Sequence, residues 1–123
     1  MKTDELLRRL ALNDEQAVQA AIGASPPLDG NAVLEGRAIL DAKTAALVRL
    51  AALLAVGAAT VSCRVTVERA RAAGATDEEV AAVLVAVGPA VGAARLVGAA
   101  PRLALALDQD IEGMDEHWES SAD

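Results

Sequence analysis

Two uncharged runs of sequence, residues 50–63 and 80–94, limit the possible folds more than any other feature. Each is roughly 15 residues long, whereas a helix needs about 20 apolar residues to cross a bilayer. Their side chains are mostly those of Ala, Val and Leu, and aromatic residues make up only 1% of the chain. The runs therefore predict buried helices in a core built almost wholly from aliphatic side chains.

The size of the chain adds a second expectation. A chain of 123 residues fits one domain and buries only about two thirds of its unfolded surface. Small side chains let helices approach closely, but each one buries little area. Two uncharged helices are more than such a chain can cover alone, so we expect a homo-oligomer.

The charge balance and the cysteine count exclude several classes of partner. The net charge is −7 and the sequence pI is near 4.6, so phosphate backbones and anionic lipids would repel the protein. We predict no nucleic-acid partner and no membrane partner. Cys63 is the only cysteine, which rules out an intrachain disulfide and a Cys-rich zinc site, and we expect neither metal nor cofactor. The first residues lack an apolar run of signal-peptide length, which makes the cytoplasm the expected location.

Capping signals mark the expected helix starts. A side chain that accepts a hydrogen bond from the first turn stabilises a helix end, and a Glu or Gln three residues later completes a capping box. Four positions carry such a signal: Thr3, Asn13 (with Gln16), Asp41 and Thr76 (with Glu79). The prolines at 26 and 27 and the LDGN that follows predict a turn after the second helix.

The segment TVSCRVTVERARAAG, residues 60–74, carries two conflicting patterns. Valines and Cys63 alternate with polar residues over 61–67, as in a half-buried strand. No other stretch alternates over a comparable length, however, and a lone strand would leave its backbone groups unpaired. Strong helix formers follow directly, and Gly74 is a common residue after a helix. We predict a helix here, antiparallel to the one before it.

Proline and glycine interrupt the last third of the chain. Pro89 is expected to kink or restart its helix, because it lacks a donor N–H. Gly92 and Gly98 follow, so a final helix is expected only from Pro101 onward. The acidic end is more typical of a solvated tail than of a site. The expected division, within a single domain, is N-terminal helices and a turn (residues 1–30), a helical core (31–109) and an acidic tail (110–123).

Three pieces of sequence are informative in combination. They are LDAKTAALVRLAAL, then ERARAAGATDEEVAAVL, then an Ala-rich helix interrupted by Gly and Pro. Over residues 40–107 the chain resembles the carboxymuconolactone decarboxylase and alkylhydroperoxidase D-like family. The resemblance implies an all-α, alkylhydroperoxidase D-like bundle of about six helices. It also implies assembly into trimers or hexamers.

The peroxidase members of that family carry a C-x-x-C-x-x-x-H pattern. Laid on this chain, the pattern places Thr60 and Cys63 at the cysteines and Val67 at the histidine. Thr60 cannot resolve a disulfide, and Val67 cannot transfer a proton. Val48 stands where those members place an acid on the preceding helix. These departures argue against the hydroperoxidase mechanism.

The decarboxylase branch of the family does not depend on the cysteine pair, which leaves a second set of candidates. The candidate residues are Cys63 and Glu68 for catalysis and Arg49, Arg64 and Arg95 for holding a substrate carboxylate. Glu68 is the only acid between residues 41 and 77 and could act as a base. The alternative is an exposed Glu68 in an ion pair with Arg64 or Arg71. For Cys63 the alternative is inert packing.

The resulting prediction is an oligomeric family member that is not a thiol peroxidase and has a binding or assembly role. Two alternatives stay open: a non-redox enzyme acting on a small lactone or organic acid, and a single-cysteine peroxidase-type oxidoreductase. An enclosed pocket with converging Arg and Glu side chains would support an enzyme. A pocket filled by Val and Ala would support a scaffold.

Overall fold

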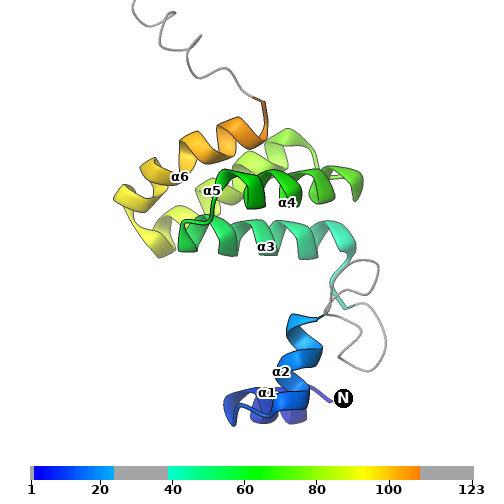
Figure 1. The fold of residues 1–123 in the computed structure, drawn as a ribbon. Coiled ribbons are helices and arrows are strands. Elements are labelled where there is room, and N and C mark those ends of the chain that lie inside the picture. Colours follow the sequence, from blue (N-terminus) through cyan, green and yellow to red (C-terminus); the bar gives the residue numbers. More distant parts are fainter. Residues whose placement is uncertain (1, 24–38, 109–123) are drawn as a thin grey trace, which may run out of the picture. The chain divides into compact units, whose positions relative to one another are not determined.

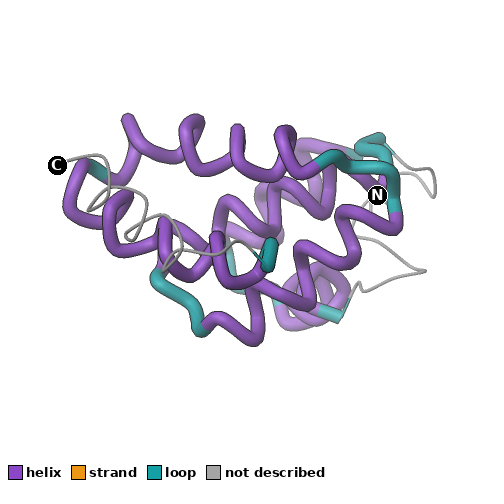
Figure 2. Tube along the Cα trace, turned by 90° about the horizontal axis from the view of Figure 1, so that it is seen from above, coloured by secondary structure: helices purple, strands orange, loops and turns teal. Residues whose placement is uncertain are grey.

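The computed structural model describes residues 2–23 and 39–108, which form six helices and no strand (Figures 1 and 2). The helices are α1 (Thr3–Ala11), α2 (Glu15–Ile22), α3 (Ala42–Val56), α4 (Thr60–Ala72), α5 (Asp77–Val91) and α6 (Ala93–Ala106). The prediction of an all-α protein with about six helices is confirmed. The predicted turn around residues 25–31 and the acidic tail lie outside the described residues.

Contacts divide the chain into two compact units, Met1–Ala45 and Ala46–Asp123, and the division falls inside α3. In the first unit α1 packs against α2. In the second unit α6 packs against both α4 and α5. Within the described ranges, no helix is both long enough and apolar enough to span a membrane.

The core of the second unit is aliphatic and draws on all four of its helices. Its largest fully buried side chains are Leu50 of α3, Cys63 and Val67 of α4, and Val80 of α5. Leu103 and Ala106 of α6 belong to the same cluster. The helices α3 and α4 run in opposite directions, as predicted (Figure 1). The two uncharged runs supply four of the twelve buried residues of this cluster, namely Leu50, Leu54, Cys63 and Val80.

The helix predicted for the alternating segment is confirmed as α4. Its buried residues follow helical spacing: Cys63, Thr66, Val67 and Ala70. Val61 and Val65, which completed the strand-like alternation, are exposed. Gly74 has a φ of 101° and donates its N–H to the Arg71 carbonyl, the pattern in which a glycine closes a helix. The alternation therefore carried no information about the backbone.

Two of the four predicted helix caps are present. Thr76 Oγ1 accepts a hydrogen bond from the Glu79 N–H, and Glu79 Oε1 accepts one from the Thr76 N–H, both at 3.1 Å. Asp41 Oδ1 accepts a hydrogen bond from the Thr44 N–H at 2.7 Å. This bond to the backbone lowers the pKa of the Asp41 carboxyl, with a smaller contribution from the Lys43 charge.

The other two predicted caps are wrong by one residue. Lys2, not Thr3, precedes α1, and no side chain caps that helix. Asn13 follows the end of α1 in the left-handed conformation, with a φ of 57°, and Asp14 caps α2 through the Ala17 N–H at 3.0 Å. Asn adopts the left-handed region more readily than most residues, so it serves to close one helix here.

Two prolines lie inside helices where the sequence predicted breaks. The helix α5 continues through Pro89 to Val91, and α6 already begins at Ala93 and includes Pro101. The final helix predicted to begin at Pro101 is therefore wrong. Both prolines are exposed, so water can reach the carbonyl that each leaves without a donor. The break falls at Gly92, whose φ of 87° and ψ of 166° are accessible essentially only to glycine.

Candidate functional site

Of the five predicted site residues, Arg95 lines the pocket that the described residues form between α3 and α6. Cys63 lies in the core, fully buried. Arg49 is half-buried on α3, and Glu68 is exposed on α4; neither lines the pocket. The convergence of Arg and Glu side chains that would support an enzyme does not occur among the residues lining this pocket.

Arg64 has a structural role instead. Its guanidinium donates to Asp108 Oδ1 at 3.0 Å and to the Leu105 carbonyl at 2.7 Å, which ties α4 to the last turn of α6. Arg71 Nε donates to Asp77 Oδ1 at 2.9 Å. Both arginines proposed as partners of Glu68 are thus paired with other carboxylates.

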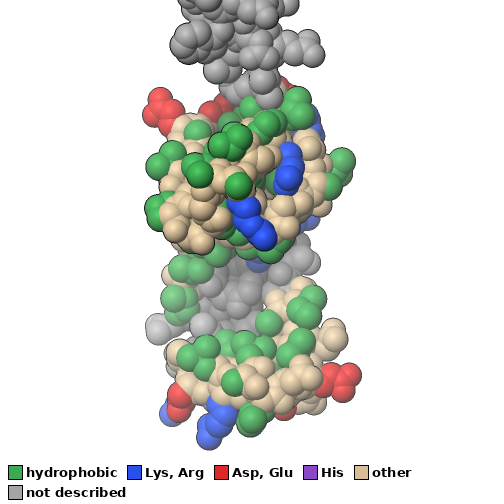
Figure 3. Space-filling model, turned by 90° about the vertical axis from the view of Figure 1, so that its left-hand side faces the viewer, with side chains coloured by type: hydrophobic (Ala, Val, Ile, Leu, Met, Phe, Trp, Pro, Cys, Tyr) green, Lys and Arg blue, Asp and Glu red, His purple; other side chains and the backbone are tan. Residues whose placement is uncertain are grey.

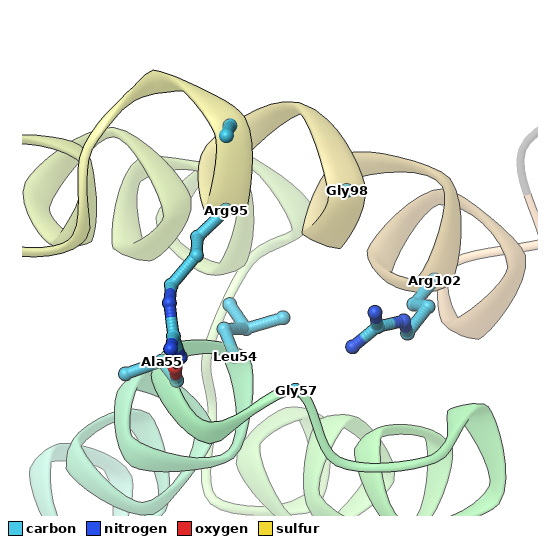
Figure 4. A pocket seen from close by; sticks show the side chains of 7 residues that line it. Leu54, Ala55, Gly57, Arg95, Gly98 and Arg102 are labelled. Carbon is cyan, nitrogen blue, oxygen red and sulfur yellow. Dashed lines mark hydrogen bonds between the residues drawn. The ribbon is translucent and has the colours of Figure 1, made fainter.

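The pocket lies between the end of α3 and one face of α6. It has a volume of about 310 Å³ and an open mouth. Its lining consists of Leu54, Ala55 and Gly57 near the end of α3, and Ala94, Arg95, Gly98 and Arg102 of α6. Figure 4 shows Arg95 reaching from α6 to Ala55, and Arg102 extending from the same helix towards Gly57.

The end of α3 explains part of this arrangement. Gly57, with a φ of 74°, donates its N–H to the Leu54 carbonyl, and the Ala58 N–H reaches the Leu53 carbonyl at 2.9 Å. These two bonds form the glycine-dependent closure known as a Schellman motif. They leave the Ala55 carbonyl without a donor from the helix itself.

The two arginines of α6 reach this helix end. Arg95 Nη1 donates to the Ala55 carbonyl at 2.9 Å, and Arg102 Nη1 lies 3.4 Å from the Ala58 carbonyl. Cations are favoured near helix C-termini, where the carbonyl dipoles point outward. Part of the function of both arginines is therefore to complete the fold.

The lining is electrostatically one-sided. Arg95 and Arg102 are its only charged residues, and neither forms an ion pair within the described part of the chain. A guanidinium has five N–H donors, and one contact to a carbonyl leaves most of them available. Ala94 lies in the first turn of α6, whose unpaired N–H groups add positive potential at that edge. In Figure 3, basic side chains stand among hydrophobic and neutral atoms on one face of the second unit.

The part of the chain that forms the pocket matches a known protein family. The model of the carboxymuconolactone decarboxylase family matches residues 28–105, more than half of the sequence. This chain belongs to the carboxymuconolactone decarboxylase family. The resemblance predicted from the sequence is confirmed, and the pocket lies wholly within the matched residues. Neither the comparison with curated proteins nor that with solved structures gives a match.

Arg102 is the charged residue of this pocket that was not among the candidates from the sequence. It lies seven residues after Arg95, a spacing that returns to the same face of a helix after nearly two turns. The signal was present in the sequence as two arginines separated by a glycine and small or apolar residues. The expected helix boundary at Pro101 separated the two arginines and concealed it.

The thiol that would carry peroxidase chemistry in this family lies outside the pocket lining. The Cys63 side chain is fully buried, and burial raises the pKa of its thiol, while the Arg102 charge lowers it by a smaller amount. Val67, at the position of the family's histidine, is also fully buried in the core. Because the thiolate is the nucleophile, a buried thiol with a raised pKa is poorly suited to attack a peroxide.

Proposed function

We propose that this member of the carboxymuconolactone decarboxylase family binds a small organic anion in the pocket between α3 and α6, and that it is not a thiol peroxidase. The observation that carries the proposal is the pair Arg95 and Arg102 in a lining that contains no carboxylate. In a chain with a net charge of −7, two cations in one pocket that have no acidic partner among the described residues favour a negatively charged ligand.

The lining supports binding more than catalysis. A general base has to come within about 3 Å of the proton that it removes. Glu68, the acid that the sequence suggested, is exposed on α4 and is not part of the described lining. A non-redox reaction on a lactone or organic acid would need a general base of this kind in the pocket. A non-redox enzyme is therefore the second candidate, after binding.

Titration with benzoate tests the proposal, with benzamide as the neutral analogue of the same shape. We expect benzoate to bind the full chain, and benzamide to bind far more weakly. A hydrogen bond to a charged group contributes about 1.5–3 kcal/mol, so Arg95→Gln and Arg102→Gln should each raise the Kd roughly tenfold or more. Backbone amide shifts of Gly57 and Gly98 in NMR spectra would report occupancy.

The matched control is Arg69→Gln, which removes an exposed arginine of α4 outside the lining. This variant should bind benzoate as the unmodified chain does. Equal affinity for benzoate and benzamide, or equal affinity in all three arginine variants, would contradict the proposal.

We also propose that the protein is a homo-oligomer. Large apolar side chains are exposed on three helices of the second unit: Val61 of α4 (74%), Val85 of α5 (73%) and Val97 of α6 (70%). Exposed apolar surface of this kind favours association with another protein surface. Light scattering at micromolar concentration should give a multiple of 12.5 kDa, with three or six subunits expected from the family resemblance. A monomer mass would contradict this prediction.

A further inference from the structure

Gly98 occupies the space between the two pocket arginines. It lies three residues after Arg95 and four before Arg102, so all three residues share one face of α6 (Figure 4). A Cβ atom built at Gly98 would meet no atom within 4 Å. Residue 98 therefore contributes no side chain to the surface between the two arginines, and a side chain there would have room among the described residues.

The backbone does not require glycine at this position. Gly57, Gly74 and Gly92 have positive φ values, whereas Gly98 does not. Glycine in a helix interior makes the helix less stable than alanine does, and the helical backbone at position 98 does not need glycine. Close packing does not explain it either: at Gly88 a Cβ would lie 3.4 Å from the Leu96 side chain, but at Gly98 it would be free. Because Gly98 lines the pocket, glycine at this position leaves that part of the pocket wall without a side chain.

We propose that Gly98 determines the size of the anion that the pocket accepts, admitting a carboxylate with a compact apolar body that lies over residue 98. This inference rests on the proposed anion binding. The arginines hold the carboxylate, and Leu54, Ala55 and Ala94 provide apolar walls for the body. The volume of about 310 Å³ lies at the lower end of the range of small-molecule pockets, roughly 300–1,000 Å³, which fits a compact ligand such as benzoate.

The experiment compares acetate with benzoate on the full chain and on the variants Gly98→Ala and Gly98→Leu. Both replacements favour the helix, and their Cβ atoms meet no obstacle in the described part of the chain, so the fold should persist. We expect Gly98→Leu to raise the Kd for benzoate at least tenfold while the Kd for acetate changes less than twofold. Gly98→Ala should have an intermediate effect on benzoate. The Gly57 amide reports binding in every variant.

Each other outcome overturns the inference in a recognisable way. If benzoate and acetate both bind the unmodified chain, but Gly98→Leu leaves both unchanged or weakens both equally, size selection by Gly98 is wrong while anion binding stands. If neither anion binds the unmodified chain, both proposals fail. If light scattering shows that Gly98→Leu changes the mass of the assembly, residue 98 serves contact between subunits and not ligand selection.

Discussion

Replacement of Leu50 by alanine is expected to lower the free energy of unfolding by about 2–5 kcal/mol. The Leu50 side chain has no exposed surface and belongs to the cluster formed by α3, α4, α5 and α6. Its neighbours in that cluster are Ala, Val, Leu and Cys, and the described residues include no aromatic ring that could move into the cavity. Proteins of this kind have total stabilities of only about 5–15 kcal/mol, so the loss is a large fraction of the whole.

Denaturation by urea, followed by far-UV circular dichroism, measures this loss. The control is Leu105→Ala, because the Leu105 side chain is 49% exposed and only its carbonyl forms the bond to Arg64. An exposed apolar truncation of this kind should cost about 0.5 kcal/mol or less. Similar losses in the two variants would show that Leu50 is not the core residue described here.

The second large effect concerns the thiol of Cys63. Its reaction with iodoacetamide is expected to be about a hundredfold or more slower in the native protein than in denaturant, because a fully buried side chain reacts only when the structure opens. Hydroperoxide consumption in the presence of a dithiol should be equal for the unmodified chain and Cys63→Ser. Both expectations follow from a buried thiol without a resolving cysteine or a histidine beside it.

A neighbouring residue supplies the control for the labelling experiment. Ser62 precedes Cys63 on α4 and is exposed, so a chain carrying Ser62→Cys together with Cys63→Ser should be labelled at nearly the rate of a free thiol. Fast labelling of Cys63 itself in the native state would contradict its burial. A peroxide turnover that disappears in Cys63→Ser would restore the single-cysteine peroxidase alternative.

The burial of the Cys63 thiol should make the free energy of unfolding depend on pH. The pKa of the Cys63 thiol is raised in the folded protein, so the native state keeps a proton that the unfolded chain loses above about pH 8.5. The free energy of unfolding should therefore fall as the pH rises above that value, by at most about 1.4 kcal/mol per pH unit, until the native thiol also ionises. This slope should be absent in Cys63→Ala.

The features that the sequence predicts correctly are those set by neighbouring residues. The capping box of Thr76 depends on a residue three positions away, and the cap at Asp41 does too. The wrong predictions of helix ends arise where the local sequence is compatible with two structures. Asn13 and Asp14 are adjacent and both suit a helix end, and Pro89 is tolerated because it is exposed. Exposure depends on tertiary packing, which the local pattern does not contain.

The candidate site was harder to predict for the same reason. Arg64 and its partner Asp108 are 44 positions apart, and Arg95 contacts a carbonyl 40 positions earlier. Only the packing of the helices decides which arginine reaches a pocket and which one closes a helix. Arg95, a candidate from the sequence, lies in the pocket lining, whereas placing Arg102 beside it required knowing that α6 continues through Pro101.

The conformation of Gly92 determines the position of both charged residues of the pocket, Arg95 and Arg102. A single residue connects α5 to α6, and its dihedral angles set the direction in which the arginine-bearing helix leaves the corner. Because only one residue links the two helices, an insertion or a side chain at position 92 would change the direction of α6. Such a change would displace both guanidinium groups at once. A side chain at position 98, in contrast, projects from the middle of α6 and leaves the direction of the helix unchanged. The ligand selection proposed for Gly98 can therefore change without moving α6, whereas a change at Gly92 displaces both arginines of the pocket.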